Sequence, residues 1–229
     1  MNWRGLYSIW ILVTLIFVMM FILTGPADAQ RYDLKPYSPL RKGITWNYLQ
    51  TYNDGSKNYE VYCIGGTETV NGKVTKKIWE FDSGELAFYD HSYDCKAWTT
   101  EGLKLYKSAT SAGDYTIYDP PAVILPVTMR VGRTFQYTST RTEYDPSGIV
   151  TSTGPFIIEL TLMGKETITV RSGQYNCLKL SGREFDMQWW DFTIWLAPGV
   201  GEVKRVYTGV EDRELLSFTR EDTTRYPVD

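Results

Sequence analysis

Residues 41–48 read RKGITWNY, and residues 130–137 read RVGRTFQY. Both stretches fit the pattern R-x-G-x-T-aromatic-x-Y. In each copy two aromatic side chains stand two positions apart, so on a β-strand they share one face. The glycine directly precedes the strand, where a tight turn into the strand needs a residue that can adopt positive φ. The repeated pattern therefore predicts a packing element, the entry strand of two related β units, and not a binding site.

Further short sequence matches between the two halves follow in the same order along the chain. Residues 66–70 read GTETV and residues 164–168 read GKETI, while GLK at 102–104 is matched loosely by GEVK at 201–204. Landmarks that recur in order indicate a duplicated unit whose copies share a core. We therefore predict a single β domain over residues 30–229, built of two repeats at about 41–119 and 130–220.

Strand signals fill this region. The chain holds 17 tyrosines and 8 tryptophans, types that favour strands, and we find no convincing helix. Asn71-Gly72 between two β-prone runs is the preferred two-residue hairpin turn, and a longer hairpin is expected around DPSG at 145–148. The three prolines of PPAVILP, residues 120–126, predict a connector there. The expected fold class is all-β, with duplicated antiparallel units forming one curved sheet or half-barrel behind an N-terminal signal helix.

Residues 1–29 have the layout of a secretory signal peptide. Arg4 gives a positive start, a mostly apolar run extends from Tyr7 to Leu23, and Ala27-Asp28-Ala29 forms an A-x-A cleavage site. We expect cleavage before Gln30 and export of the mature chain. The alternative is an uncleaved membrane anchor, and in that case this segment would supply the membrane contact.

Charge and cysteine usage narrow the classes of partner. The formal net charge is -3, and charges of both signs are scattered without a basic stripe, which argues against nucleic acid as a partner. Because the chain has three cysteines, at least one of them has no disulfide partner within the chain. In an oxidising compartment Cys63 and Cys95 are candidates for a disulfide, whereas Cys177 among alternating apolar neighbours is expected to be a buried thiol.

Three longer stretches carry a resemblance to a known class of proteins. PPAVILPVTMRVGRTFQY, VRSGQYNCLKL and WLAPGVGEVK resemble recurring elements of exported bacterial proteins of unknown function in the TapB-like class. That class is similar to the curved antiparallel sheets of the lipoprotein-carrier type. The resemblance implies a β module of the bacterial periplasm, the cell envelope or the secreted fraction, and it supplies no catalytic residues.

Catalytic and metal-binding patterns are weak. A single histidine, His91, excludes multi-histidine zinc sites, and the nucleophile-elbow pattern G-x-S-x-G is absent. Glu184, Asp186 and Asp191 lie close enough in sequence to suggest a glycosidase-like pair, but their separation in space is not readable from sequence. We predict no cofactor and no metal, and we keep open a hydrolase of extracellular polymers that uses Asp186, Asp191 or His91.

The strongest binding signal is MQWWDFTIWL at 187–196. On a strand, Trp190, Phe192, Ile194 and Leu196 would face the core, while Trp189, Asp191, Thr193 and Trp195 would face the other way. This second face is either another packing layer or an exposed aromatic platform for a sugar, a lipid or a protein.

Three functional hypotheses follow. The first is a non-enzymatic module that binds a hydrophobic ligand, a glycan or an envelope protein through Trp189, Asp191, Thr193 and Trp195. The alternatives are the hydrolase described above and a structural assembly component.

Overall fold

The computed structural model describes residues 30–82, 91–186 and 188–220. Within these ranges the chain is all-β apart from the short 3-10 helix η1. The elements in chain order are β1 (Arg31–Asp33), η1 (Lys35–Tyr37), β2 (Thr45–Tyr52), β3 (Lys57–Val70), β4 (Lys73–Asp82), β5 (His91–Trp98), β6 (Gly102–Thr110), β7 (Tyr115–Pro126), β8 (Thr128–Arg130), β9 (Thr134–Tyr144), β10 (Val150–Val170), β11 (Gly173–Asp186), β12 (Gln188–Ala197), β13 (Gly201–Tyr207) and β14 (Glu211–Thr219).

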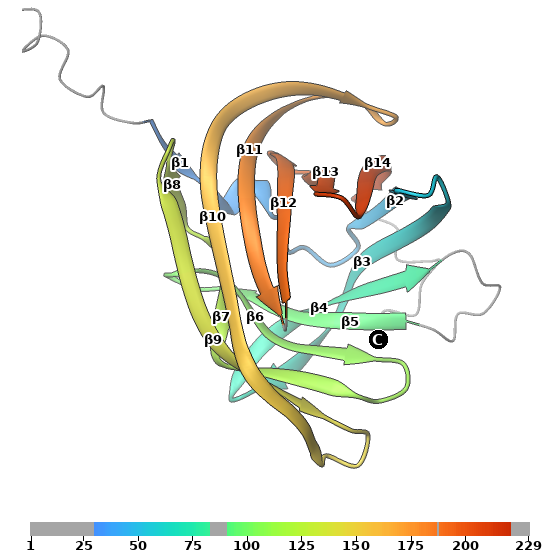
Figure 1. The fold of residues 1–229 in the computed structure, drawn as a ribbon, viewed down its shortest axis with the longest axis vertical. Helices are drawn as coiled ribbons and strands as arrows, with labels where there is room; N and C mark the ends of the chain where they lie inside the picture. Colours follow the sequence, from blue (N-terminus) through green and yellow to red (C-terminus); the bar gives the residue numbers. More distant parts are fainter. Residues whose placement is uncertain (1–29, 83–90, 187, 221–229) are drawn as a thin grey trace, which may run out of the picture. The chain divides into compact units, whose positions relative to one another are not determined.

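Twelve strands form one closed antiparallel barrel (Figure 1) in the order β10-β11-β12-β13-β14-β2-β3-β4-β5-β6-β7-β9, and β1 pairs separately with β8. Two pairings between strands that do not follow one another in the chain complete it. β14 pairs with β2, with Phe218 opposite Trp46, and β7 pairs with β9, with Tyr118 opposite Arg141. The all-β class is confirmed, but the open curved sheet or half-barrel is wrong, because these pairings close the sheet on itself.

The predicted signal peptide, residues 1–29, lies outside the described residues, and so does its helix. Across 30–82, 91–186 and 188–220, no helix is long and apolar enough to cross a membrane.

The two copies of the opening pattern have the same local geometry. Gly43 and Gly132 both adopt positive φ, at 86° and 74°. The Gly43 N–H donates to the carbonyl of Ile64 at 2.9 Å, and the Gly132 N–H donates to the carbonyl of Leu162 at 2.7 Å. In each case the accepting residue directly precedes a register shift in its strand. The pattern is thus an architectural one, and duplication of the whole unit stays a prediction.

The hairpin predictions hold, whereas the connector prediction fails. Asn71 and Gly72 both have positive φ, at 49° and 75°, as the two-residue turn between β3 and β4 requires. PPAVILP, however, belongs to β7. Strand β7 pairs with β9 only up to Asp119. The prolines after Asp119 therefore lie where no backbone N–H is needed for pairing with β9.

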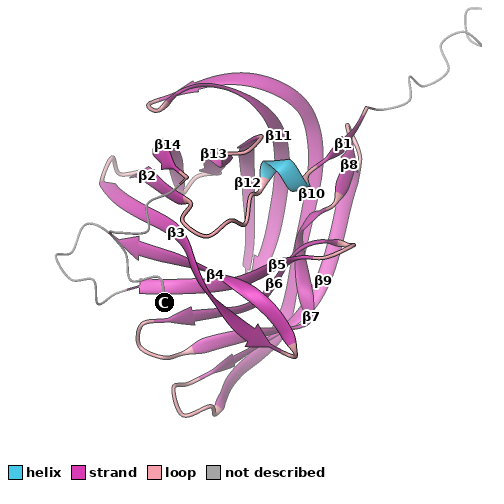
Figure 2. Cartoon of the chain, turned by 180° about the vertical axis from the view of Figure 1, so that it is seen from behind, coloured by secondary structure: helices cyan, strands magenta, loops and turns pink. Residues whose placement is uncertain are grey.

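The segment from Leu34 to Leu40 closes one end of the barrel (Figure 2). Leu34 is fully buried, and its N–H donates to the carbonyl of Val127 at 2.8 Å. The carbonyl of Pro36 accepts from Gly199 N–H at 2.7 Å, and the Trp98 indole donates to the carbonyl of Ser38 at 3.0 Å. The β7–β8 connection, the β12–β13 turn and the end of β5 therefore hold this segment in place.

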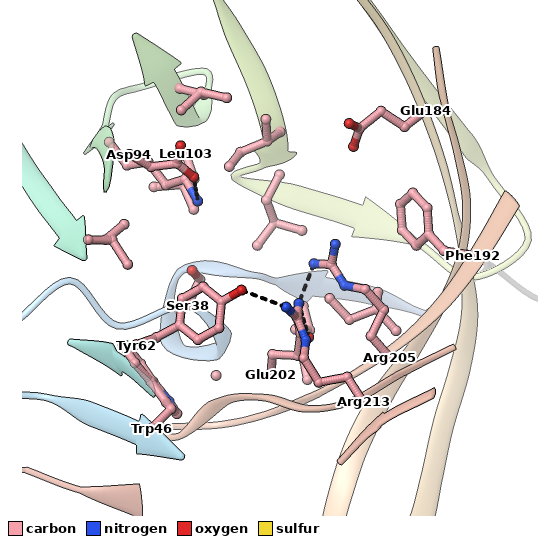
Figure 3. Close-up of a pocket in the computed structure, with 18 of the residues that line it drawn as sticks. Ser38, Trp46, Tyr62, Asp94, Leu103, Glu184, Phe192, Glu202, Arg205 and Arg213 are labelled. Carbon is pink, nitrogen blue, oxygen red and sulfur yellow. Dashed lines mark hydrogen bonds and ion pairs between the residues drawn. The ribbon is translucent and has the colours of Figure 1, made fainter. Parts of the chain in front are cut away.

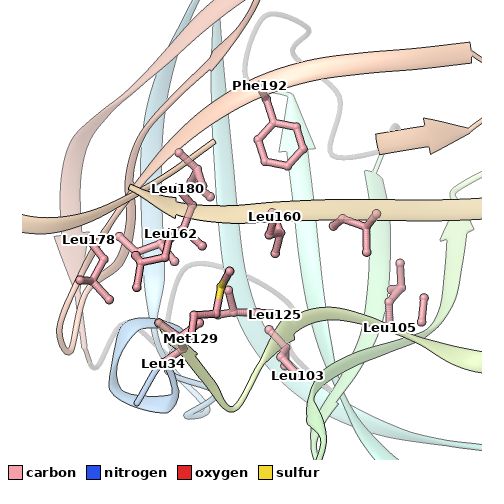
Figure 4. Packing of buried hydrophobic residues seen from close by; sticks show 14 of the residues in the cluster. Leu34, Leu103, Leu105, Leu125, Met129, Leu160, Leu162, Leu178, Leu180 and Phe192 are labelled. Atoms are coloured by element: carbon pink, nitrogen blue, oxygen red, sulfur yellow. The ribbon is translucent and has the colours of Figure 1, made fainter. Parts of the chain in front are cut away.

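The main core fills the same end of the barrel. Figure 4 shows leucines from β6, β7, β10 and β11 meeting Leu34 and Met129. The residues of this cluster include Leu103, Leu105, Leu125, Phe156, Ile158, Leu160, Leu162, Leu178, Leu180 and Phe192. A second cluster contains Ile44, Trp46, Tyr48 and Cys177, so the aromatics of the opening pattern pack and Cys177 is buried as expected.

The predicted disulfide between Cys63 and Cys95 is not formed. Cys63 lies opposite Trp79 of β4, and Cys95 lies opposite Lys77 of β4, so the whole of β4 separates the two thiols. Strands two places apart in a sheet are roughly 10 Å apart, whereas a disulfide needs Cα atoms within about 7 Å. Both cysteines are buried, in separate apolar clusters.

Candidate functional site

The barrel encloses a cavity of about 550 Å³. Its wall is divided by residue type. The strands β6, β7, β10, β11 and β12 contribute mostly apolar side chains, whereas β2, β3, β4, β5, β13 and β14 contribute mostly polar and aromatic ones. In the barrel order the polar set is continuous, and the apolar set is continuous apart from β9, which lies between β7 and β10 and contributes no lining residue. We call these sets the apolar arc and the polar arc, and Figure 3 shows the cavity between them.

The centre of the polar arc is an ion-paired network on the β13–β14 hairpin. Glu202 accepts from Arg213 through Nε at 3.0 Å and Nη2 at 2.7 Å, and from Arg205 Nη2 at 2.7 Å. Arg213 Nη1 also donates to Glu60 at 3.1 Å and to the Tyr62 hydroxyl at 2.8 Å. One carboxylate therefore bridges two guanidinium groups, and strand β3 holds the far side of Arg213.

Hydroxyl groups extend this network. The Tyr62 hydroxyl donates to Glu80 at 2.6 Å, and the Tyr48 hydroxyl donates to the carbonyl of Glu202 at 2.9 Å. The Arg213 guanidinium lies over both tyrosine rings, 5.3 Å and 5.2 Å from their centres. Such stacking fixes the direction of the charged group.

Glu184 of β11 is a carboxylate placed on the apolar arc. It lies opposite Ile158 of β10, and Figure 3 shows it beside Phe192, across the cavity from Tyr62. The Glu184 carboxylate has no hydrogen-bond or ion-pair partner among the described residues. Phe192 is held in place because its ring lies over Gly182, where an added Cβ would stand 2.4 Å from Cζ.

The carboxylates of Glu202 and Glu184 have opposite pKa shifts. Burial acts to raise the pKa of Glu202, but Arg205 and Arg213 outweigh it and lower the value to about 2. Burial raises the pKa of Glu184, and Arg205 offsets this only in part, while Asp186 and Asp94 add to it. Glu202 is therefore firmly ionised, whereas the anion of Glu184 is poorly stabilised by its surroundings.

The charges around the cavity do not balance. The acidic lining residues are Glu60, Glu80, Asp94, Glu184, Glu202 and Glu211, and the basic ones are Lys96, Arg205 and Arg213. Six carboxylates against three cations give a formal charge of -3 for the described lining. Every one of the three cations already binds a carboxylate, since Lys96 pairs with Asp94 at 2.8 Å.

The residues of the hydrolase hypothesis do not converge. Asp186 lies opposite Phe156 on the inward side of the wall and pairs with Arg141. Asp191 pairs with Arg183 on the outward side at 2.8 Å. His91 packs against the rings of Trp79 and Phe81, on the face of β4 opposite to Glu80. In the described part of the chain, no group of three metal-ligating side chains comes together.

The predicted binding face of β12 points out of the barrel. Phe192, Ile194 and Leu196 line the cavity, as expected for the core face, so the alternate residues Trp189, Asp191, Thr193 and Trp195 face outward. Trp189 is 42% exposed, but the Arg183 guanidinium lies 4.5 Å from its ring centre.

Trp195, on the same outward face, donates to Glu166 at 3.1 Å and has Lys179 over its ring. Both outward tryptophans thus already contact cations of this chain through their ring faces.

Sequence reasoning missed the polar arc. Arg205 and Arg213 are directly opposite each other in the β13–β14 hairpin, which its short turn makes predictable. Charged residues on strands ordinarily face water, however. Arg205 and Arg213 face an interior only because the sheet closes into a barrel. The available signal was the density of charge and tyrosine in GEVKRVY followed by EDREL.

No family model and no curated protein sequence matches this chain. Among solved structures it is similar to a predicted exported protein with a YMCC-like fold from Bacteroides fragilis, with a TM-score of 0.51 and 13% identity over 80% of this chain and 99% of that one. A predicted lipoprotein from Parabacteroides distasonis gives a TM-score of 0.43 and 12% identity over 80% and 98%. The first likeness shows a shared fold, and the resemblance to the TapB-like class stays a prediction.

Proposed function

We propose that this protein is a non-enzymatic binding protein, exported to the cell envelope or beyond, that holds a small amphipathic ligand inside its barrel. The observation that carries the proposal is the division of the cavity wall into an apolar and a polar arc. A volume of about 550 Å³ lies within the range of roughly 300–1,000 Å³ that small-molecule sites occupy.

The two arcs would act on different parts of such a ligand. Leucine, isoleucine and phenylalanine side chains of β6, β10, β11 and β12 would bury its apolar body, at about 25 cal/mol for each Å² removed from water. The network around Glu202 and Arg213 would orient its polar end, because those groups are already fixed by one another. Their side chains are each 13% exposed although they lie inside the barrel, so the polar arc is accessible from within the cavity.

A dye-binding measurement tests whether the interior is the site. N-phenyl-1-naphthylamine is uncharged and apolar, and we expect it to bind and fluoresce. Ile124 lines the cavity and is only partly buried, so Ile124→Trp should place an indole ring in part of the cavity and weaken dye binding at least tenfold. The matched control is Ile149→Trp, at a position 65% exposed, which should bind as the parent does.

Thermal unfolding of both variants shows that each is folded. Equal dye binding by folded Ile124→Trp and the parent would overturn the proposal.

The outward face of β12 supports a second candidate, a glycan or envelope-protein site at Trp189, Asp191, Thr193 and Trp195. The exposure of Trp189 favours it. The cations that already lie over both tryptophan rings weaken it, since they occupy the surface on which a sugar would stack. The hydrolase and assembly hypotheses have no comparable support.

A further inference from the structure

The cavity offers more negative than positive charge to whatever enters it. Of its six carboxylates, Glu60, Asp94 and Glu202 bind the three lining cations, and Glu211 accepts from the neutral amide of Gln50. An anionic head group would therefore meet cations that are already neutralised and carboxylates that repel it.

Glu184 is the carboxylate best placed to contact a ligand. It projects from the apolar arc beside Phe192, and no described residue donates a hydrogen bond to it. The side chain of Glu184 is only partly buried and lines the cavity, so its carboxylate can be reached from inside the barrel. A group held in this way is suited to a partner that arrives from outside the chain.

Arg205 restricts the ligand further. Its Nη1 donates to the Tyr207 hydroxyl at 2.8 Å and its Nη2 donates to Glu202, while its buried Nε has no partner among the described residues. The charge of Arg205 is compensated by Glu202, so this remaining N–H needs only a neutral oxygen. A hydroxyl or a water molecule meets that need, and no anion is required.

We propose, on the basis of the function proposed above, that the ligand is a cationic amphiphile whose protonated nitrogen binds Glu184 while its apolar chain lies along the apolar arc. The nitrogen would donate a charge-assisted hydrogen bond to the carboxylate, the strongest kind of hydrogen bond that a protein makes with a small molecule.

Three probes with the same chain and different head groups test this inference by isothermal titration calorimetry at pH 7. Decylamine is cationic, decanoate is anionic, and 1-decanol is neutral. A charge-assisted hydrogen bond corresponds to about ten- to a hundredfold in affinity. We therefore expect decylamine to bind at least tenfold more tightly than 1-decanol, and decanoate to bind most weakly.

The matched variants are Glu184→Gln and Glu159→Gln. Glu159 follows Ile158 on β10 and so points out of the barrel. Glu184→Gln should weaken decylamine about tenfold and leave 1-decanol unchanged, whereas Glu159→Gln should change neither.

The outcomes separate the two proposals. Decanoate binding as tightly as decylamine, or decylamine binding that is insensitive to Glu184→Gln, would overturn the cationic ligand while leaving the barrel as the site. If none of the three probes binds, or if all bind equally well to Ile124→Trp, the barrel interior itself is ruled out.

Discussion

Arg213 and Glu202 face each other inside the barrel and share two hydrogen bonds, from Nε at 3.0 Å and from Nη2 at 2.7 Å. Both donors bind the same oxygen, Oε1, while Oε2 accepts from Arg205, so each carboxylate oxygen of Glu202 is held by a different arginine. Because Glu202 also binds Arg205, this single carboxylate organises the polar arc. Ligand binding inside the barrel is favoured when this arc is fixed before any ligand arrives.

Glu202→Gln should destabilise the fold, because it leaves Arg205 without its carboxylate partner and Arg213 with Glu60 alone. Breaking a buried ion pair costs roughly 3–5 kcal/mol of unfolding free energy. Because the Glu202 side chain borders the cavity, we expect the lower end of this range, about 3 kcal/mol. Because the pKa of Glu202 lies at about 2, its stabilisation is present above its unfolded pKa and is lost as the pH falls from about 4.5 toward 2. Urea unfolding at pH 7 and pH 3 measures both effects, and a loss below 1 kcal/mol at pH 7 would contradict this role.

Glu184→Gln should have the opposite effect on stability. Burial raises the pKa of Glu184 in the field of Arg205, Asp186, Asp94 and Lys96. The folded state therefore binds this proton more tightly than the unfolded state does, and the carboxyl group's contribution to stability is lost as the pH rises through the folded-state pKa. We expect Glu184→Gln to be more stable than the parent at pH 8, by on the order of 1 kcal/mol.

At pH 4 the two proteins should unfold alike, since both then carry a neutral side chain at position 184. Chemical unfolding at the two pH values checks this difference. A variant that is less stable than the parent at pH 8 would show that Glu184 is a structural partner and not a group reserved for a ligand.

Gly182→Ala should destabilise the barrel while Gly154→Ala does not. A Cβ at position 182 would stand 2.4 Å from Phe192 Cζ and 2.9 Å from a Leu160 methyl, so the ring that borders the cavity must move. Overpacking of this kind typically costs about 1–3 kcal/mol. Nothing lies within 4 Å of a Cβ at position 154, in the adjacent strand β10. Equal melting temperatures for the two variants would argue against the packing described for Phe192.

The double variant Trp189→Ala/Trp195→Ala should retain binding of decylamine and of the apolar dye. Both tryptophans point away from the cavity, and their ring faces contact Arg183 and Lys179. Titration of the folded double variant checks this expectation. Loss of binding of either probe would move the site from the interior to the outward face of β12.

Cys63, Cys95 and Cys177 should all react with iodoacetamide in denatured protein that has never been reduced. The intervening strand β4 keeps the first two apart, and all three are thiols in the folded chain. Intact-mass measurement should find three added groups. Fewer than three would show that a disulfide forms in spite of this separation.

The sequence allowed the strands to be predicted better than their closure. The turn at Asn71-Gly72 and the alternation of Phe192, Ile194 and Leu196 are local signals, and both are confirmed. Pairing of β14 with β2 joins the two ends of the domain, and no local pattern encodes it. The site depends on that pairing, because only closure turns Arg213 inward. Trp189 and Trp195 stand out by residue type alone, whereas Glu184 and Arg205 line a site only in the closed barrel.

The most direct test of the central claim is a crystal structure of the protein with 10-bromodecylamine, in which anomalous scattering locates the bromine. We expect the bromine among the leucines of the apolar arc and the nitrogen within about 3 Å of the Glu184 carboxylate. A bromine site outside the barrel, or a nitrogen directed away from Glu184 toward the outward face of β12, would contradict it.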